Sequence, residues 1–220
     1  MLPFIDIHTH HRSPFAKGCI EIYNAFLNKN QGAAYYSVGI HPWYIHREED
    51  QIGHLNSLLA NDKDILAIGE CGLDYAIETP KEIQMPFFQA QINFAEKFKK
   101  PLIIHCVKAF DDLIALKKQN KGSQAWIIHG YNKSPELAST LINHGFYLSI
   151  GSKLCNNKRL EDILKSIPLE RLFFETDNDE KNTIEDIYEQ SVYILELSMD
   201  DLKKKIEMNF NIVFNDGRPI

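Results

Sequence analysis

The segments Ile65-Leu66-Ala67-Ile68-Gly69-Glu70 and Leu102-Ile103-Ile104-His105 decide the fold class of this sequence. Each is a short apolar run that ends in an ionisable residue. A nearly continuous apolar run is typical of a parallel strand buried on both faces, whereas a half-exposed antiparallel strand alternates apolar and polar residues. The two segments therefore predict parallel strands at Ile65–Gly69 and Leu102–Cys106, with Glu70 directly after the first and His105 at the end of the second.

Similar segments recur along the whole chain. Further strands are predicted at Phe4–His8, Cys19–Asn24, Ala34–Ile40, Ala125–His129, Phe146–Ile150 and Leu172–Glu175. Helices are predicted at Gln51–Ala60, Phe87–Lys99, Phe110–Lys118, Ser134–His144, Arg159–Ile167, Ile184–Leu197 and Asp200–Phe210. Eight strands that alternate with helices favour an α/β fold, a TIM-type (β/α)8 barrel in one domain over residues 1–220, with a doubly wound sheet as the alternative. Few residues separate the first three strands, so we expect an abbreviated barrel whose early helices are missing or vestigial.

Composition excludes several other classes of protein. The 220 residues include 44% hydrophobic and 25% charged residues, which excludes disordered, collagen-like and coiled-coil chains. The formal net charge of −6 argues mildly against a large nucleic-acid surface. The sequence shows neither a signal peptide nor an apolar stretch long enough to span a membrane, and its four cysteines are scattered singly. We therefore expect a cytoplasmic protein with reduced thiols and no obligate protein partner.

Six ionisable residues follow or end the predicted strands. They are His8, His10, Glu70, His105, His129 and Asp177. The carboxyl ends of the strands of a parallel barrel meet at one rim, where active sites of this architecture are built. Four imidazoles and two carboxylates suit zinc, manganese or another borderline divalent ion better than calcium. Six ligands exceed the needs of one tetrahedral ion, and Glu70 is the natural bridge between two ions roughly 3.5–4 Å apart.

An ordered set of motifs carries a family resemblance over nearly the whole chain. The motifs are Asp6-Ile7-His8-Thr9-His10, Gly39-Ile40-His41-Pro42, Gly69-Glu70-Cys71-Gly72-Leu73-Asp74-Tyr75, Pro101-Leu102-Ile103-Ile104-His105, Ile128-His129-Gly130, Glu175-Thr176-Asp177 and Asn209-Phe210-Asn211-Ile212-Val213-Phe214. In this combination the sequence resembles the TatD family of metal-dependent hydrolases. The resemblance implies a TIM-type barrel with a two-metal centre and deoxyribonuclease activity on DNA ends. It further implies that His8, His10 and Asp177 hold one metal, that His105 and His129 hold the other, and that Glu70 is shared.

The sequence also departs from the family pattern. Family members usually carry Arg two residues beyond the histidine that matches His105, but Val107 stands there and the nearest cation is Lys108. A lysine cannot reproduce the bidentate grip of a guanidinium on phosphate. Asp177 is followed by Asn178-Asp179-Glu180, whose two acids would repel a polyanion. These departures leave the six ligand positions intact and concern the substrate.

The predicted function is hydrolysis of phosphodiester bonds, in DNA or a small phosphodiester, with two divalent ions (Zn, Mn or Mg). Water activated by the ions would attack phosphorus, and Glu70 or Asp177 would accept its proton. The residues expected to contact substrate are His41, Lys108 and Tyr131. One alternative is a hydrolase of a small non-nucleic-acid ester, amide or phosphate. The other is a metal-binding barrel without activity.

Three further residues have a functional and a structural interpretation. Asp6 shares the face of His8 and could orient a ligand, or make an ordinary buried contact. Asp74 could hydrogen-bond a metal ligand or shape the turn after Gly72. Trp43, in a loop at the rim, could stack a base or sugar, although rim packing is the more frequent outcome for such a ring.

Overall fold

The computed structural model describes residues 2–11, 18–28, 32–46 and 49–214. It contains eight strands: β1 Phe4–Thr9, β2 Cys19–Asn24, β3 Tyr35–Val38, β4 Ile65–Asp74, β5 Leu102–Val107, β6 Trp126–Ile128, β7 Phe146–Gly151 and β8 Leu172–Glu175. They follow one another in the sheet in chain order, and the neighbouring pairs whose registers are defined are all parallel. This is the predicted α/β barrel of eight parallel strands.

The last strand returns to the first. Directly after β8, Asp177 forms a parallel bridge with Thr9 of β1. The Asp177 N–H donates to the His8 carbonyl, and the His10 N–H donates to the Asp177 carbonyl, each over 2.9 Å. A doubly wound sheet has a permuted strand order and open edges, so this pairing excludes that alternative.

In the part of the chain that the structure describes, seven α-helices accompany the strands. They are α1 Gln51–Asn61, α2 Lys81–Phe98, α3 Phe110–Gln119, α4 Pro135–Asn143, α5 Arg159–Ser166, α6 Ile184–Leu195 and α7 Met199–Phe214. Short 3-10 turns lie at η1 Pro42–Tyr44, η2 Ser152–Asn156 and η3 Leu169–Arg171. Among the described residues between β1 and β3 there is no helix, as the spacing of the early strands predicts. None of the helices in the described ranges is long and apolar enough to cross a membrane.

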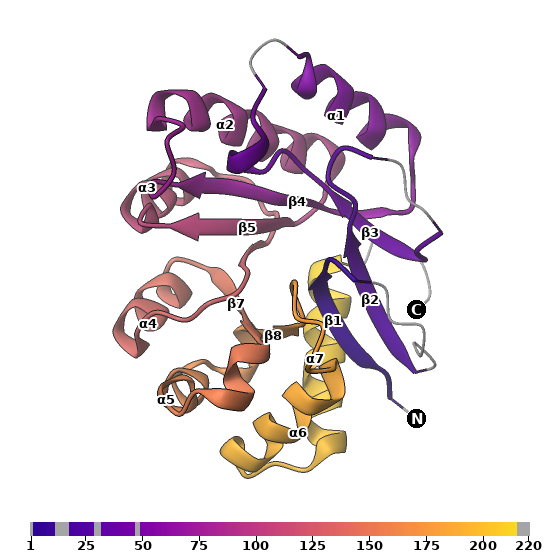
Figure 1. Cartoon of the computed structure of the whole chain (residues 1–220), viewed down its shortest axis with the longest axis vertical. Helices are drawn as coiled ribbons and strands as arrows, with labels where there is room; N and C mark the ends of the chain where they lie inside the picture. The colour runs from indigo at the N-terminus through magenta and orange to yellow at the C-terminus, as the bar shows by residue number, and fades with distance from the viewer. Residues whose placement is uncertain (1, 12–17, 29–31, 47–48, 215–220) are drawn as a thin grey trace. The chain divides into compact units, whose positions relative to one another are not determined.

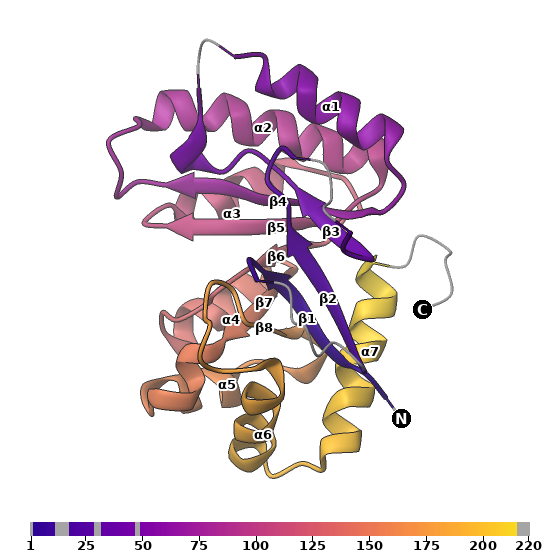
Figure 2. The same ribbon diagram turned by 45° about the vertical axis from the view of Figure 1, so that its right-hand side comes forward.

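The chain divides into two compact units, one formed by residues 1–23 and 129–220 and the other by residues 24–128. In the continuous unit, α2 runs along β4 (Figure 1) and α1 packs against α2. Phe88 of α2 packs edge-on against Trp126 of β6 with ring centroids 6.0 Å apart. In the discontinuous unit, α7 runs beside β1 (Figure 2). Tyr188 of α6 also holds this strand, because its hydroxyl accepts from the Ile5 N–H and donates to the Ile5 carbonyl, both over 3.2 Å.

The two largest differences from the predicted element boundaries lie in β4 and α2. Strand β4 continues five residues past Gly69, to Asp74, because its second half pairs with β5, Gly72 lying opposite His105. Helix α2 begins at Lys81 and contains Pro86, which in sequence resembles a helix boundary. The helix tolerates this proline near its start because one missing hydrogen bond is outweighed by burial of residues such as Phe88.

Gly72 is required where β4 approaches β5. Its φ is +141°, and a Cβ atom there would lie 2.0 Å from the carbonyl oxygen of His105. Gly145 also has a positive φ, of +85°, but nothing lies within 4 Å of its Cβ position. The two glycines therefore separate the cost of an unfavourable φ from the cost of a clash.

We expect Gly72→Ala to lower the free energy of unfolding by about 3 kcal/mol or more, since the backbone strain and the overpacking add. Gly145→Ala, which carries the strain alone, should cost about 1 kcal/mol. Urea denaturation followed by circular dichroism measures both. Equal destabilisation by the two substitutions would contradict the close approach of β4 to β5.

Candidate metal-binding site

His8, His10 and Asp177 lie together in the discontinuous unit. His8 is fully buried in β1 and His10 follows the strand. The Nε2 atoms of His8 and His10 lie 3.7 Å and 3.5 Å from Asp177 Oδ1. Each residue offers one ligand atom, and the three atoms lie within 4.8 Å of one another. The backbone bonds between Asp177 and β1 hold the three side chains at this spacing.

His129 and Glu175 extend this group. His129 follows β6, and its Nδ1 lies 3.2 Å from Oε1 of Glu175, which is fully buried at the end of β8. The ring centroids of His129 and His8 are 4.6 Å apart. Burial raises the pKa of the Glu175 carboxyl, but the charge of His129 and its hydrogen bond outweigh burial and hold this pKa below its usual value. His129, Glu175 and Asp177 form a second set of clustered donors. The ligand prediction did not include Glu175.

Asp6 supports this group from within β1. Its Oδ2 accepts from the Thr176 hydroxyl over 2.6 Å, and its Oδ1 accepts from the backbone N–H groups of His8 and Thr176, each over 3.2 Å. Burial raises the pKa of Asp6 to about 8 even though the bonds from Thr176 act to lower it. Asp6 thus ties the main chain at His8 to the segment that leads to Asp177.

In the continuous unit, Glu70 lies between two histidines. Its Oε1 is 3.0 Å from Nδ1 of His105 and 3.1 Å from Nε2 of His41. Asn24 holds the opposite side of Glu70, since its Oδ1 accepts from the Glu70 N–H and its Nδ2 donates to Glu70 Oε2. Glu70 and His41 are buried, and His41, Glu70 and His105 form a third set of clustered donors.

The hydrogen bonds around His41 indicate which of its two ring nitrogens carries the proton when the imidazole is neutral. The Trp43 backbone N–H donates to His41 Nδ1 over 3.1 Å, so this nitrogen carries a lone pair. A neutral imidazole has one N–H group, which in His41 must then be Nε2–H, directed at Glu70. In this tautomer His41 is a hydrogen-bond donor to Glu70, in keeping with its absence from the predicted ligand set.

His105 lies between two carboxylates. Its Nε2 is 3.1 Å from Asp74 Oδ2, which also accepts from the Trp43 indole N–H over 2.8 Å. Burial raises the pKa of Asp74, but hydrogen bonds from Trp43, Ala76 and His105 outweigh burial and hold this pKa below its usual value. In the tautomer with the proton on Nε2, His105 donates to Asp74 and its Nδ1 lone pair faces Glu70.

Two buried glutamines of α2 fix the segments that carry this group. Gln84 Oε1 accepts from the Asp74 N–H over 2.7 Å, and its Nε2 donates to the Asp74 carbonyl over 2.6 Å. Gln91 does the same for Ile40, the residue before His41, over 2.8 Å and 3.1 Å. The signal in the sequence is a pair of glutamines seven residues apart on the apolar face of a helix.

The predicted substrate-contact residues differ in accessibility. Lys108 is exposed directly after β5, with a φ of +54°. Tyr131 is buried, and its hydroxyl donates to the Ser134 carbonyl over 2.7 Å. His41 is buried against Glu70 as described above.

The donor sets fit divalent ions. Two atoms bound at about 2.1 Å to one tetrahedral ion are about 3.4 Å apart. The imidazole–carboxylate separations in the two units run from 3.0 Å to 3.7 Å. Imidazole and carboxylate are also the ligands that zinc and manganese prefer. The residues therefore match the chemistry of such an ion within each unit.

Comparison with known proteins identifies the family. The chain matches the family described as TatD related DNase over residues 5–215. The chain belongs to the TatD family. The family resemblance based on the motifs is thereby confirmed.

Curated relatives and a solved structure agree with this membership. Over 163 residues the chain is 34% identical to an uncharacterized metal-dependent hydrolase of Buchnera aphidicola, a match that covers 69% of this chain and 61% of that protein. It is 31% identical over 158 residues to a 3'-5' ssDNA/RNA exonuclease TatD of Citrobacter koseri, covering 69% and 60%. The chain thus spans about three fifths of the length of these two curated relatives. A crystal structure of YJJV, a TatD homologue from Escherichia coli, shares the fold with a TM-score of 0.82 at 20% identity, covering 96% of this chain and 98% of that one.

We expect Asp74→Asn to weaken binding of Mn²⁺ or Zn²⁺ by roughly 10–100-fold, because a carboxylate that orients a ligating imidazole contributes at this level. Isothermal titration of the metal-depleted protein measures the affinity, and circular dichroism checks the fold. Asp111→Asn, at an exposed position in the first turn of α3, is the matched control and should bind the ion as the parent does. Unchanged affinity in Asp74→Asn would show that Asp74 does not orient a ligand.

Proposed function

We propose that this TatD-family protein hydrolyses phosphodiester bonds with two divalent ions, acting on DNA ends as a TatD-like deoxyribonuclease. The observation that carries the proposal is the gathering of imidazole and carboxylate donors where strands of the barrel end, in sets whose ligand atoms lie within 4.8 Å of one another. The name of the Citrobacter relative, a single-stranded DNA and RNA exonuclease, supports the choice of substrate.

The proposal assigns the candidate ligands to two ions as the family resemblance implies. It assigns His8, His10 and Asp177 to one ion, His105 and His129 to the other, and Glu70 to both. Its support is the strand order, because the carboxyl ends of parallel strands in a closed barrel share one rim. When His105 carries its proton on Nε2, the lone pair on Nδ1 can bind a cation beside Glu70. This supports the same assignment.

The chain's own side chains would manage protons and substrate. Bound divalent ions supply an activated water and offset the charge that develops on the phosphate oxygens. Asp177 or Glu70 accepts the proton from water, and the Nε2–H of His41 orients Glu70 for this task. Lys108, exposed after β5, contributes a point charge to the phosphate. Tyr131, whose hydroxyl is engaged with Ser134, supports the segment after β6.

The acids that follow Asp177 differ in their surroundings. Asp179 is tied into its own turn, since Ser152 Oγ donates to Oδ2 over 2.6 Å, and the N–H groups of Lys181 and Asn182 donate to Oδ1. These bonds hold the pKa of Asp179 well below its usual value. Its charge is therefore fixed inside a hydrogen-bonded turn, whereas Glu180 is exposed. This retained negative charge favours a short substrate with few phosphates over a long polyanion, so small phosphodiesters belong in the test.

The metal-loaded protein should cleave end-labelled single-stranded DNA or a small diester such as bis(p-nitrophenyl) phosphate, and a chelator should abolish turnover. The double change His8→Ala and His10→Ala should lower kcat/KM by more than roughly 100-fold. Loss of a residue that only orients a ligand costs up to about that factor, whereas this change removes two proposed ligands. Elemental analysis should find up to two ions per chain, and fewer in this variant.

His46→Ala is the matched control, because His46 is an exposed imidazole outside the three donor sets. It should keep the parent's metal content and rate. Metal-dependent turnover of amides or lactones but of no phosphodiester would replace the proposal with a different hydrolase. Tight metal binding without turnover of any substrate in the panel would indicate a metal-binding barrel without activity.

A further inference from the structure

Trp43 combines high exposure with a fixed position. Its side chain is 57% exposed in the short turn η1. The indole N–H nevertheless donates to Asp74, and the backbone N–H donates to His41 Nδ1. A large apolar ring in water is normally stabilised by packing, whereas this ring is held by polar atoms at its edge. Its orientation is therefore set before any ligand arrives, which lowers the entropy cost of binding to it.

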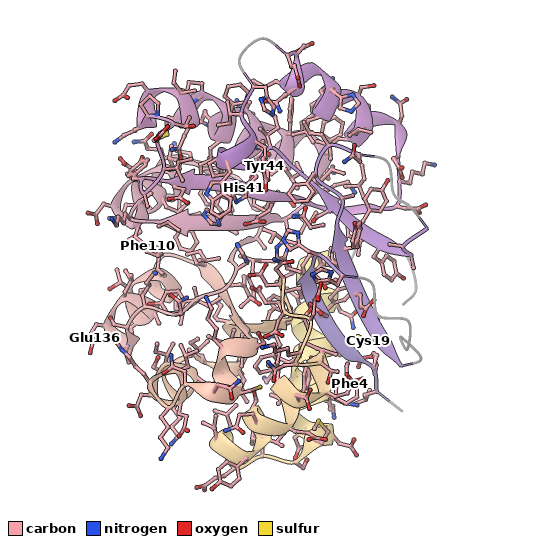
Figure 3. All side chains as sticks on the ribbon, viewed as in Figure 1. Phe4, Cys19, His41, Tyr44, Phe110 and Glu136 are labelled. Atoms are coloured by element: carbon pink, nitrogen blue, oxygen red, sulfur yellow. The ribbon has the colours of Figure 1, made fainter. Side chains whose placement is uncertain are left out.

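The ring lies beside the histidines of the proposed centre. Its centroid is 5.2 Å from that of His41 and 5.9 Å from that of His105, at interplanar angles of 90° and 74°. Tyr44, the next residue, is 49% exposed, and its ring centroid lies 5.6 Å from that of His41. Both residues are labelled in Figure 3. Two exposed aromatic rings thus flank one imidazole of the continuous unit.

The surrounding charges favour an uncharged flat ligand at Trp43. Asp74 contacts the indole directly, and Glu70 lies beyond His41 and His105, so an anion placed against this ring would meet two carboxylates. An aromatic ring with no charge of its own meets no such penalty and gains stacking energy from the indole face. In a phosphodiester substrate the ring next to the phosphate fits this description.

We propose that Trp43, held in place by Asp74, is a stacking surface for an aromatic ring of the substrate, a nucleobase in the case of nucleic acid. The inference rests on the proposed phosphodiester hydrolysis and names the part of the substrate that the site selects. It makes Trp43 a specificity-determining residue, favouring substrates that carry a flat ring beside the scissile phosphate.

The first test uses fluorescence and needs neither metal nor turnover. The sequence contains two tryptophans, Trp43 and the fully buried Trp126. Adenosine, which carries no charge, should quench the emission excited at the red edge of tryptophan absorption when added to the metal-depleted protein, and ribose should leave it unchanged. Trp43→Phe should abolish the quenching and leave the emission of Trp126. Absence of quenching, or equal quenching by both compounds, would overturn the proposal.

The second test measures selectivity. Trp43→Phe and Trp43→Leu both remove the indole N–H, but only Leu removes the aromatic ring. The ratio of kcat/KM for a base-bearing oligonucleotide to that for an abasic one should fall about 5- to 100-fold in Trp43→Leu relative to Trp43→Phe, chiefly through KM. Tyr193→Leu, at an 80% exposed ring of α6, should keep the parent ratio.

The outcomes separate the two proposals. If Trp43→Phe and Trp43→Leu are both active and have the same ratio of kcat/KM for base-bearing to abasic oligonucleotide, stacking at Trp43 is overturned. Phosphodiester hydrolysis then stays in place. Absence of turnover with any phosphodiester would remove the proposed function, while the fluorescence titration would still decide whether the indole binds an aromatic ring.

Discussion

The pair of backbone hydrogen bonds between Asp177 and β1 is the constraint on which the ligand arrangement of the discontinuous unit depends. It brings residues from the two ends of the chain into one register, with the His8 carbonyl and the His10 N–H both used by Asp177. A slip of one residue would turn every β1 side chain to the other face of the sheet. Asp6 and Thr176 reinforce the register with a bond from the Thr176 hydroxyl to the Asp6 carboxyl group. His8 and His10 lie beside Asp177 because these backbone hydrogen bonds fix their main chain next to it.

Buried polar side chains on helices fix further main-chain segments by hydrogen bonds. Gln84 and Gln91 of α2 each satisfy both backbone polar groups of one residue, and Tyr188 of α6 does so for Ile5. Asn209 of α7 donates to the carbonyls of Leu169 and Leu172 at the start of β8. An unpaired buried backbone group costs about 1–3 kcal/mol, so these side chains set where each helix rests on the sheet. Packing by apolar residues alone would allow the helices to slide.

The strands could be predicted from the sequence because they follow a local rule, and the same rule led to the candidate ligands, which stay a prediction. Apolar runs mark buried strands, and ionisable residues after them mark strand ends. Boundaries were less accurate where a residue has two uses: Gly72 resembles a strand break but permits close pairing, and Pro86 resembles a helix boundary but lies within α2. The partners Asn24, Gln91 and Glu175 were missed because their roles depend on residues far away in the chain, which no local pattern reveals.

The discontinuity of one unit has a consequence for how the protein is made. Residues 24–128 form a continuous unit, whose neighbouring strands can pair soon after they leave the ribosome. The first strand belongs instead with residues 129–220, and the bond from Thr176 to Asp6 spans 170 positions of the chain. Closing so long a loop is entropically costly and slow compared with local pairing. The histidines nearest the N-terminus are therefore the first to be synthesised and among the last to reach their partners, so a nascent chain cannot assemble the His8, His10 and Asp177 group prematurely.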